Sequence, residues 1–369
     1  MLQENISSHL SIRKSDILWA TKNFSMEYHI GIEGYYNLYN AQLEHFHQVT
    51  FSSVEEKNKS EPTKRVTNVL IKCIFYRGER SKRVFVRDAE VFTTCKHRNI
   101  VTLLGLCDEG TEMILVFEYP SNGNLYDYLI NIKESPILTW TQRLRICLDI
   151  AYGLKYLHYE MENGKVIIHG DLKSKCIGLD ENWGAKIVQF GLCEYLRPKD
   201  EDVVHFKNSF GANSYRDPEF VTTRNLKRES DVYSLGVVMF EILCGRTADD
   251  HIYKKGSDTG LASVARRCFH EGRIQEIIDP IVTNDIGENK FSLNRGPSKK
   301  SLAAFLDIAY RCLTEIQNQR PTIKVVVDEL EKALYFQVSS HSKNLKPFFS
   351  SYFYYWWYLL LSTVVSLGF

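Results

Sequence analysis

Six short motifs carry the ionisable and polar side chains that could do chemistry. Lys72 ends the apolar run Val69-Leu70-Ile71, and Asp171 and Lys173 lie together in His169-Gly170-Asp171-Leu172-Lys173. Side chains of these types bind phosphate groups and transfer protons. The other four motifs follow in the chain: Gln189-Phe190-Gly191, Asp217-Pro218-Glu219, Asp231-Val232-Tyr233-Ser234 and Arg320-Pro321-Thr322. Each motif alone is a weak signal, but six in this order are specific.

The motif order resembles that of protein kinases of the plant receptor-like type, over about residues 15–337. The first motifs match the V-A-I-K strand and the H-R-D-L-K loop, and Gln189-Phe190-Gly191 and Asp217-Pro218-Glu219 stand at D-F-G and A-P-E. The resemblance implies an α+β, bilobal protein-kinase-like fold, with a small β-rich N-lobe and a larger helical C-lobe. It also implies transfer of a phosphoryl group from ATP, with Mg²⁺, to a protein hydroxyl.

Part of the family's machinery is present by this resemblance. Lys72 stands where a lysine contacts the α- and β-phosphates, and its helix partner falls on Asp88 in place of a longer glutamate. Because aspartate is one methylene shorter, the ion pair needs the helix to move inward; Glu90 should face away. Asp171 is the candidate base and Lys173 accompanies it.

Both magnesium positions have changed. The aspartate of D-F-G is replaced by Gln189, and the asparagine five residues after Asp171 is replaced by Cys176. Mg²⁺ prefers hard oxygen ligands, above all carboxylates, whereas a thiol is soft. The sequence therefore predicts no metal site, with both residues as structural fillers.

The nucleotide-binding segments are altered as well. The G-x-G-x-x-G pattern keeps Gly31, has Gly34 out of register, and places Glu33 and Tyr36 at the other two glycine positions. A bulky side chain stands where backbone should approach phosphate closely. In the hinge, Glu118 is a predicted nucleotide-binding residue. Two residues later, Pro120 lacks the N–H that would bind adenine.

Two further positions bear on regulation. Gly170 replaces the arginine that grips a phosphorylated activation loop in many kinases, and Ala212 replaces a hydroxyl residue of the activation segment. Activation by that route therefore loses its receptor.

The structural positions are retained. Asp231 should brace the catalytic loop, and Glu219 and Arg320 should form a buried ion pair of the large lobe. This contrast predicts a pseudokinase scaffold with impaired Mg-ATP binding. The alternative is an active or weakly active serine/threonine kinase, supported by Lys72, Asp171 and Lys173, and a third possibility is a non-functional remnant.

The elements that must position these residues follow from periodicity. Strands are expected first and helices later, an arrangement typical of α+β folds. A buried helix is expected at Val232–Leu243 with Ser230 as its N-cap. The remaining expectations are a helix near Asp16–Lys22, strands over 28–43, Val69–Ile71 and Met113–Tyr119, a loop over 44–66, a helix around Leu144–Leu157, loops over 249–300, and helices at Leu302–Leu313 and Thr322–Leu334.

Composition restricts the setting. The chain has 369 residues and a net charge of +1, so no charge excess points to nucleic acid. Nine scattered cysteines without a CxxC pair fit a reducing compartment. We expect protein partners, such as receptor-like kinases, and a location in the cytoplasm or on the cytoplasmic side of the plasma membrane.

The predicted organisation is a lead-in (1–27), an N-lobe (28–119), a C-lobe (120–337) and a hydrophobic tail (338–369). The N-terminus has neither a signal peptide nor the second-position glycine that myristoylation needs. Residues 348–369 carry no charge in 22 positions, and a helix of that length spans about 33 Å, enough for a bilayer core. A tail anchor is one interpretation; a disordered or wrongly translated tail, or an amphipathic cover, is the other.

Overall fold

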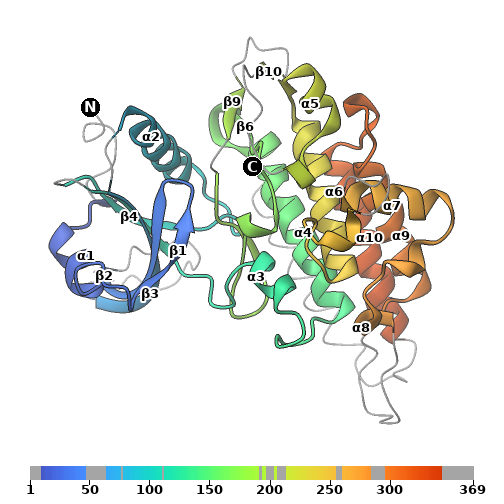
Figure 1. The fold of residues 1–369 in the computed structure, drawn as a ribbon, viewed down its shortest axis with the longest axis horizontal. Coiled ribbons are helices and arrows are strands. Elements are labelled where there is room, and N and C mark those ends of the chain that lie inside the picture. Colours follow the sequence, from blue (N-terminus) through green and yellow to red (C-terminus); the bar gives the residue numbers. More distant parts are fainter. Residues whose placement is uncertain are drawn as a thin grey trace, which may run out of the picture.

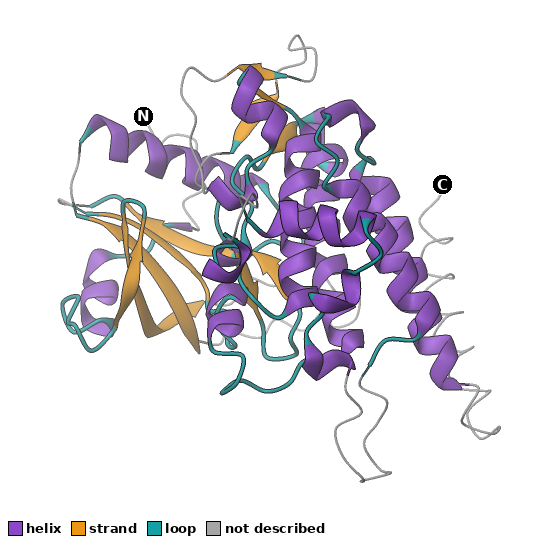
Figure 2. Cartoon of the chain, turned by 45° about the vertical axis from the view of Figure 1, so that its right-hand side comes forward, coloured by secondary structure: helices purple, strands orange, loops and turns teal. Residues whose placement is uncertain are grey.

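The computed structural model divides the chain into a small lobe built on a sheet and a larger helical lobe (Figures 1 and 2). It describes residues 10–46, 64–75, 78–109, 112–190, 193–196, 203–205, 213–254, 260–283 and 296–342. The α+β bilobal fold expected from the motifs is confirmed. The residues implicated in chemistry lie on the segments between the two lobes, which is why the arrangement of the lobes matters for the site.

The small lobe is a five-stranded antiparallel sheet in the order β1-β2-β3-β5-β4. Its strands are β1 (His29–Glu33), β2 (Tyr36–Phe46), β3 (Lys64–Ile74), β4 (Leu103–Cys107) and β5 (Met113–Glu118). Side chains of β3 alternate between two cores: Val69 and Ile71 pack with Ile17 of α1 (Lys14–Ala20), while Leu70 and Ile74 join the main core. Both faces are therefore buried, and residues 10–20 pack on the sheet.

The loop expected over 44–66 is shorter than predicted. β2 and β3 stay paired out to Phe46 and Lys64, and nothing is described of residues 47–63. Polar and charged residues can extend this hairpin because backbone hydrogen bonds hold the two strands. The register of the hairpin places the start of β2 beside Lys72, which lies opposite Leu38.

The helices later in the chain, together with several short strands, make up the large lobe. The helix α2 (Glu79–Thr94) belongs to the small lobe and lies over its sheet, next to the upper part of the large lobe (Figure 1). The large-lobe elements are α3 (Leu125–Ile130), α4 (Trp140–Lys155), β6 (Val166–Ile168), β7 (Ile177–Leu179), β8 (Ala185–Ile187), β9 (Glu194–Leu196), β10 (Val204–His205), α5 (Pro218–Thr223), β11 (Asn225–Leu226), α6 (Arg228–Cys244), α7 (Leu261–His270), α8 (Pro280–Thr283), α9 (Lys299–Cys312) and α10 (Ile323–Ser342).

The helix α6 is the centre of the large lobe. It is buried from Ser230 to Cys244, as its mostly apolar run predicted. The N-cap prediction is wrong, because the helix begins one turn earlier and Lys227 is the N-cap. Polar Arg228 and Glu229 form that less buried first turn, and the Ser230 hydroxyl is left to donate to Asp217 at 2.7 Å.

The segment 249–300 is less loop-like than expected, since α7 and α8 lie within it. Leu261, Val264, Ala265 and Cys268 of α7 are buried at helical spacing, a pattern hidden among polar neighbours. The last helix also continues to Ser342, beyond the predicted end at 334.

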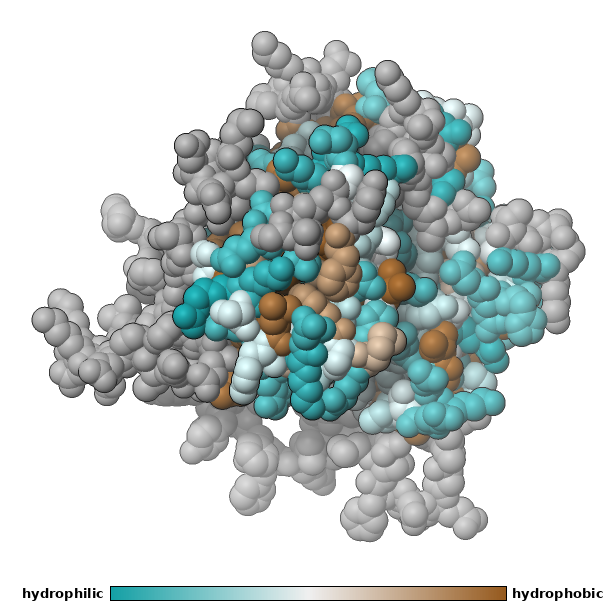
Figure 3. Space-filling view, turned by 60° about the vertical axis from the view of Figure 1, so that its left-hand side comes forward, coloured by the Kyte–Doolittle hydropathy of each residue, from teal (hydrophilic) through white to brown (hydrophobic). Residues whose placement is uncertain are grey.

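The surface of the small lobe mixes polar and apolar side chains. In the described part of the face that comes forward in Figure 3, apolar atoms form small groups among polar ones; Trp19, Met26 and Ile32 are among the strongly exposed apolar residues. Within the described ranges, no helix has the length and apolar character needed to cross a bilayer. The predicted anchor at 348–369 lies outside those ranges.

Candidate functional site

The catalytic-loop backbone is fixed by α6. The carboxylate of Asp231 accepts hydrogen bonds from the backbone N–H groups of His169 and Gly170, both at 2.8 Å. His158, in a π-helical turn that ends α4, lies 2.8 Å from the same carboxylate. Gly170 has φ 74°, a conformation that strains other residues, so glycine suits this turn. The sequence predicted that Asp231 braces the catalytic loop, and its two hydrogen bonds to the loop backbone are consistent with that role.

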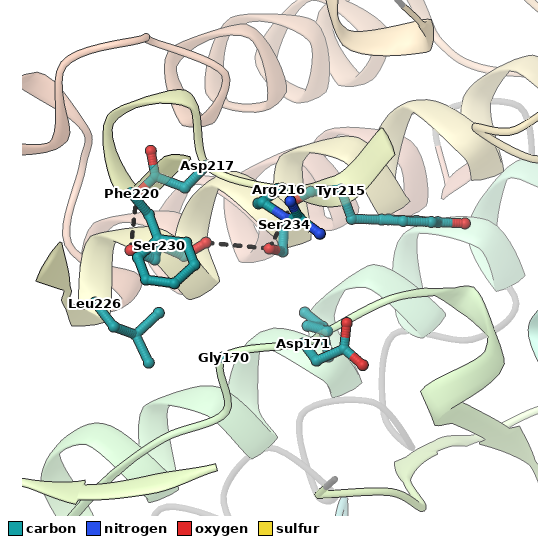
Figure 4. Close-up of a pocket in the computed structure, with 10 residues that line it drawn as sticks. Gly170, Asp171, Tyr215, Arg216, Asp217, Phe220, Leu226, Ser230 and Ser234 are labelled. Carbon is teal, nitrogen blue, oxygen red and sulfur yellow. Dashed lines mark hydrogen bonds between the residues drawn. The ribbon is translucent and has the colours of Figure 1, made fainter. Parts of the chain in front are cut away.

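Asp171 and Lys173 face each other at the loop. The Lys173 ammonium lies 2.6 Å from the Asp171 carboxylate, and both side chains are partly accessible. Figure 4 shows Asp171 at the edge of a depression that Asp217 and Ser230 border on the other side. Its volume is about 20 Å³, enough for about one water molecule. A base of the required type is thus present, in contact with a cation.

Cys176 and Gln189, which stand at the family's two magnesium positions by the motif resemblance, contact each other. The Cys176 thiol lies 3.2 Å from the Gln189 side-chain oxygen and 3.4 Å from the backbone oxygen of Asp171, so its single hydrogen can be donated to either, and Cys176 is 1% exposed. Magnesium needs near-octahedral oxygen ligands at about 2.0–2.1 Å. A buried thiol and a neutral amide do not meet that need, so these two residues do not fit Mg²⁺.

Lys72 of β3 is buried where the small-lobe sheet meets Val188 of the large lobe. Its ammonium donates to the backbone oxygen of Val188 at 3.2 Å and lies 5.9 Å from the Tyr36 ring centre and 5.6 Å from that of Phe117. The side chain is only 2% exposed. Cation–π contacts of this kind stabilise a desolvated ammonium. The lysine is therefore in place, but aromatic rings and a carbonyl surround it.

Tyr36 links the glycine-loop hairpin to α2. Its hydroxyl donates to the Asp88 carboxylate at 2.9 Å, and both residues are buried. Asp88 is thus buried against the hairpin, whereas Glu90 is exposed and faces away, as expected. The sequence identified Tyr36 as bulky but did not predict its contact with Asp88.

Two other contacts hold α2 against the large lobe. The Phe92 ring lies 4.9 Å from Phe190, which in turn lies 5.3 Å from His169 of the catalytic loop. The Arg87 guanidinium donates to the backbone oxygen of Cys193 at 3.0 Å. Burial lowers the pKa of His169, and its Nε2 lies 2.6 Å from the backbone oxygen of Gln189. An unbroken series of contacts therefore joins α2 to the catalytic loop.

The two glycines of the β1–β2 hairpin serve its backbone. Glu33 pairs with Tyr36, so Gly34 and Tyr35 form a two-residue turn, and Gly34 has φ 57°. Gly31 lies at an irregularity in the register with φ 150°. Nothing is described of the Glu33 side chain. The glycines are explained by the hairpin without a nucleotide.

The hinge is packed against β7. A side chain on Gly178 would place its Cβ 2.6 Å from Val188 and 3.0 Å from Pro120, so only glycine fits between them. The Glu118 carboxylate accepts from Lys186 at 2.7 Å and from the backbone of Thr102 at 2.8 Å. The Glu118 side chain therefore ties the hinge to β8 and β4, and Pro120 has no N–H to offer a base.

The predicted ion pair of the large lobe needs a correction. Arg320 pairs with Asp217 at 2.6 Å, while Glu219 accepts from the backbone N–H of Gln317 at 2.7 Å. Asp217 caps α5 by accepting from Glu219 N, and this directs its carboxylate inward. Burial alone would raise the pKa of Asp217, but Arg320, with Gln317 and Ser230, lowers it overall.

A buried cluster around Glu241 was missed. The Glu241 carboxylate accepts from Tyr215, from Ser174 at 3.3 Å and from the backbone of Ala248 at 2.7 Å. Burial raises the pKa of Glu241 to about 8. A charged residue inside the apolar run of α6 was the available signal. The predicted activation-segment position Ala212 and the glycine of Gln189-Phe190-Gly191 lie outside the described residues.

The comparisons with known proteins agree with this geometry. The family described as "Protein tyrosine and serine/threonine kinase" matches residues 42–330, and the chain belongs to the protein kinase family. Its similar curated proteins are plant receptor-like kinases and related kinases. In Arabidopsis thaliana, "Receptor-like protein kinase FERONIA" is 33% identical over 341 residues, 92% of this chain and 34% of that protein.

Two more relatives come from the same plant. "Receptor-like protein kinase ANXUR2" is 34% identical over 346 residues, which cover 91% of this chain and 36% of that protein. "Probable serine/threonine-protein kinase PBL28" is 33% identical over 316 residues, 86% of this chain and 76% of that protein. The chain thus spans about a third of the length of the receptor-like relatives and most of PBL28.

Proposed function

We propose that this receptor-like kinase family member is a pseudokinase, a signalling protein that uses the kinase fold to bind other proteins. The contact between Cys176 and Gln189 carries the proposal. Phosphoryl transfer depends on positioning and on neutralising charge with Mg²⁺. Two neutral side chains that hydrogen-bond each other at the metal positions remove the main means of doing so.

Two further features support the proposal. Pro120 and Val188 meet at Gly178, beside the hinge where adenine would bind, and the Tyr36 ring lies next to Lys72. The bracing contacts of Asp231 and Arg320 are complete. A chain that keeps its scaffold and loses its nucleotide contacts fits a binding role better than a remnant.

The second candidate function is an active or weakly active serine/threonine kinase that uses ATP and Mg²⁺. Asp171 in contact with Lys173, and the buried Lys72, favour it. These groups would hold a substrate hydroxyl and phosphate oxygens, but no Mg²⁺ ligand set accompanies them. We therefore rank this candidate second.

For partners and location, we propose other proteins of the signalling machinery, with receptor-like kinases as the first candidates. The relatives' names describe receptor-like kinases, which supports the proposed site of action in the cytoplasm or on the cytoplasmic side of the plasma membrane. The tail at 348–369 is a proposed means of membrane association.

The test separates binding from catalysis in the plant. A null line is complemented with the full chain carrying Asp171→Ala or Arg320→Ala, with protein amounts checked by blot. We expect Asp171→Ala to complement fully, because a scaffold transfers no proton, and Arg320→Ala to fail through unfolding. Failure of a normally abundant Asp171→Ala protein would favour the enzyme.

A further inference from the structure

Tyr36 stands at the start of β2, where the family pattern has its third glycine. The side chain is 3% exposed, so the ring is buried away from solvent. It lies on the same face as Leu38, whose partner across the ladder is Lys72. The alternation of the strand thus brings the tyrosine ring to the lysine.

The ring makes two contacts that a glycine cannot make. Its centre lies 5.9 Å from the Lys72 ammonium, and its hydroxyl donates to Asp88 at 2.9 Å. In the family's use of the cleft, this lysine holds phosphate oxygens, so the ring fills space beside the group that would bind them. A charge-assisted hydrogen bond to a buried carboxylate is among the stronger kinds.

These contacts compensate for the shorter acidic side chain of α2. Asp88 falls one methylene short of the glutamate expected there, and Tyr36 reaches it from the opposite hairpin. The contact lies near the middle of α2, between the Arg87 contact with Cys193 and the Phe92 contact with Phe190. Together they fix the helix from the sheet and from the large lobe.

We infer that Tyr36 is a built-in occupant of the nucleotide cleft that positions α2 without any nucleotide. The inference rests on the proposed function, since a chain that binds Mg-ATP would need this space. It follows that α2 keeps the position set by these contacts at every ATP concentration. A partner that recognises the outer face of α2 would therefore bind independently of nucleotide.

The test uses amide hydrogen exchange of the full chain without nucleotide. Tyr36→Phe removes only the hydroxyl, and Tyr35→Phe, at the exposed neighbouring turn position, is the matched control. We expect Tyr36→Phe to speed exchange in α2 about tenfold, equivalent to about 1.4 kcal/mol, with α6 amides unchanged. Tyr35→Phe should leave both helices as in the natural chain.

A second readout is the accessibility of Lys72. Acetylation by acetic anhydride, followed by peptide mass spectrometry, should rise several-fold in Tyr36→Gly when normalised to Lys186. Unchanged α2 exchange in Tyr36→Phe together with unchanged Lys72 acetylation in Tyr36→Gly would overturn the inference. So would an equal rise in α2 and α6, which would mean that Tyr36 stabilises the whole fold.

Failure of the proposed function gives a different result. Stabilisation of the natural chain by ATP that depends on Mg²⁺ would refute the pseudokinase proposal directly. It would also refute the inference that Tyr36 occupies the nucleotide site. If that stabilisation is absent while both α2 exchange and Lys72 acetylation are unchanged in the Tyr36 variants, only the inference about Tyr36 fails.

Discussion

Replacing Arg320 by alanine should destabilise the large lobe severely. The guanidinium donates to the Asp217 carboxylate and to three backbone oxygens, those of Thr314, Glu229 and Glu315, at 2.6–3.0 Å. It also lies 4.9 Å from the Tyr233 ring centre. The substitution removes all of these contacts at once and leaves a buried carboxylate without its cation.

The expected loss is about 3–5 kcal/mol, typical of a buried pair broken from one side. That is a large part of the margin of about 5–15 kcal/mol of an ordinary domain. Arg320→Lys should cost less, because it keeps the charge but loses the planar fork of donors. Arg311→Ala is the matched control: its pair with Asp307 is exposed, so the cost should stay within about 0.5 kcal/mol.

The assay is urea unfolding of the full chain followed by circular dichroism. Arg320→Ala combined with Asp217→Asn should recover part of the loss, since the stranded charge is then gone. Because Arg320 lowers the pKa of Asp217, its contribution is complete above the unfolded value of 3.8 and is lost as pH falls below it. The reasoning is refuted if Arg320→Ala and Arg311→Ala differ by less than about 1 kcal/mol near neutral pH, against the 3–5 kcal/mol expected.

Three other outcomes are expected. Gln189→Asp alone should restore no autophosphorylation with radiolabelled ATP, because Cys176 remains; detectable product would mean that one carboxylate suffices. Glu241, with a native pKa of about 8 against 4.5 in the unfolded chain, binds a proton on folding, so stability should fall as pH rises between those values, by at most about 1.4 kcal/mol per pH unit. Between pH 6 and 8 the urea midpoint should fall less in Glu241→Gln than in the natural chain. An equal fall in both proteins would show that Glu241 does not cause it. Truncation after Lys346 should move the protein from a membrane pellet to the supernatant, and a full chain already in the supernatant would exclude the anchor.

Motif order and periodicity predicted much of the fold. The buried helix α6 followed from its apolar run, and the positions of Lys72, Asp88 and Asp171 followed from the spacing of the motifs. These features depend on residues close together in sequence or on a fixed family order. These features can therefore be predicted from the amino-acid sequence alone.

The long-range contacts within the large lobe could not be predicted in the same way. Asp217 and Glu219 are two residues apart, and which one meets Arg320 depends on where α5 begins. The thiol of Cys176 and the amide of Gln189 meet only because two separate segments converge. Such pairings are set by tertiary geometry, and the sequence contains only the unusual residue types.

The most direct test of the central claim is a thermal unfolding titration of the full chain with ATP, in the presence of Mg²⁺ and in the presence of EDTA. A ligand at a hundred times its Kd stabilises a protein by about 2.7 kcal/mol, which is readily seen as a rise in Tm. The contact between Cys176 and Gln189 predicts the same Tm in both series at every ATP concentration. A rise in Tm with ATP that appears only when Mg²⁺ is present would contradict the account.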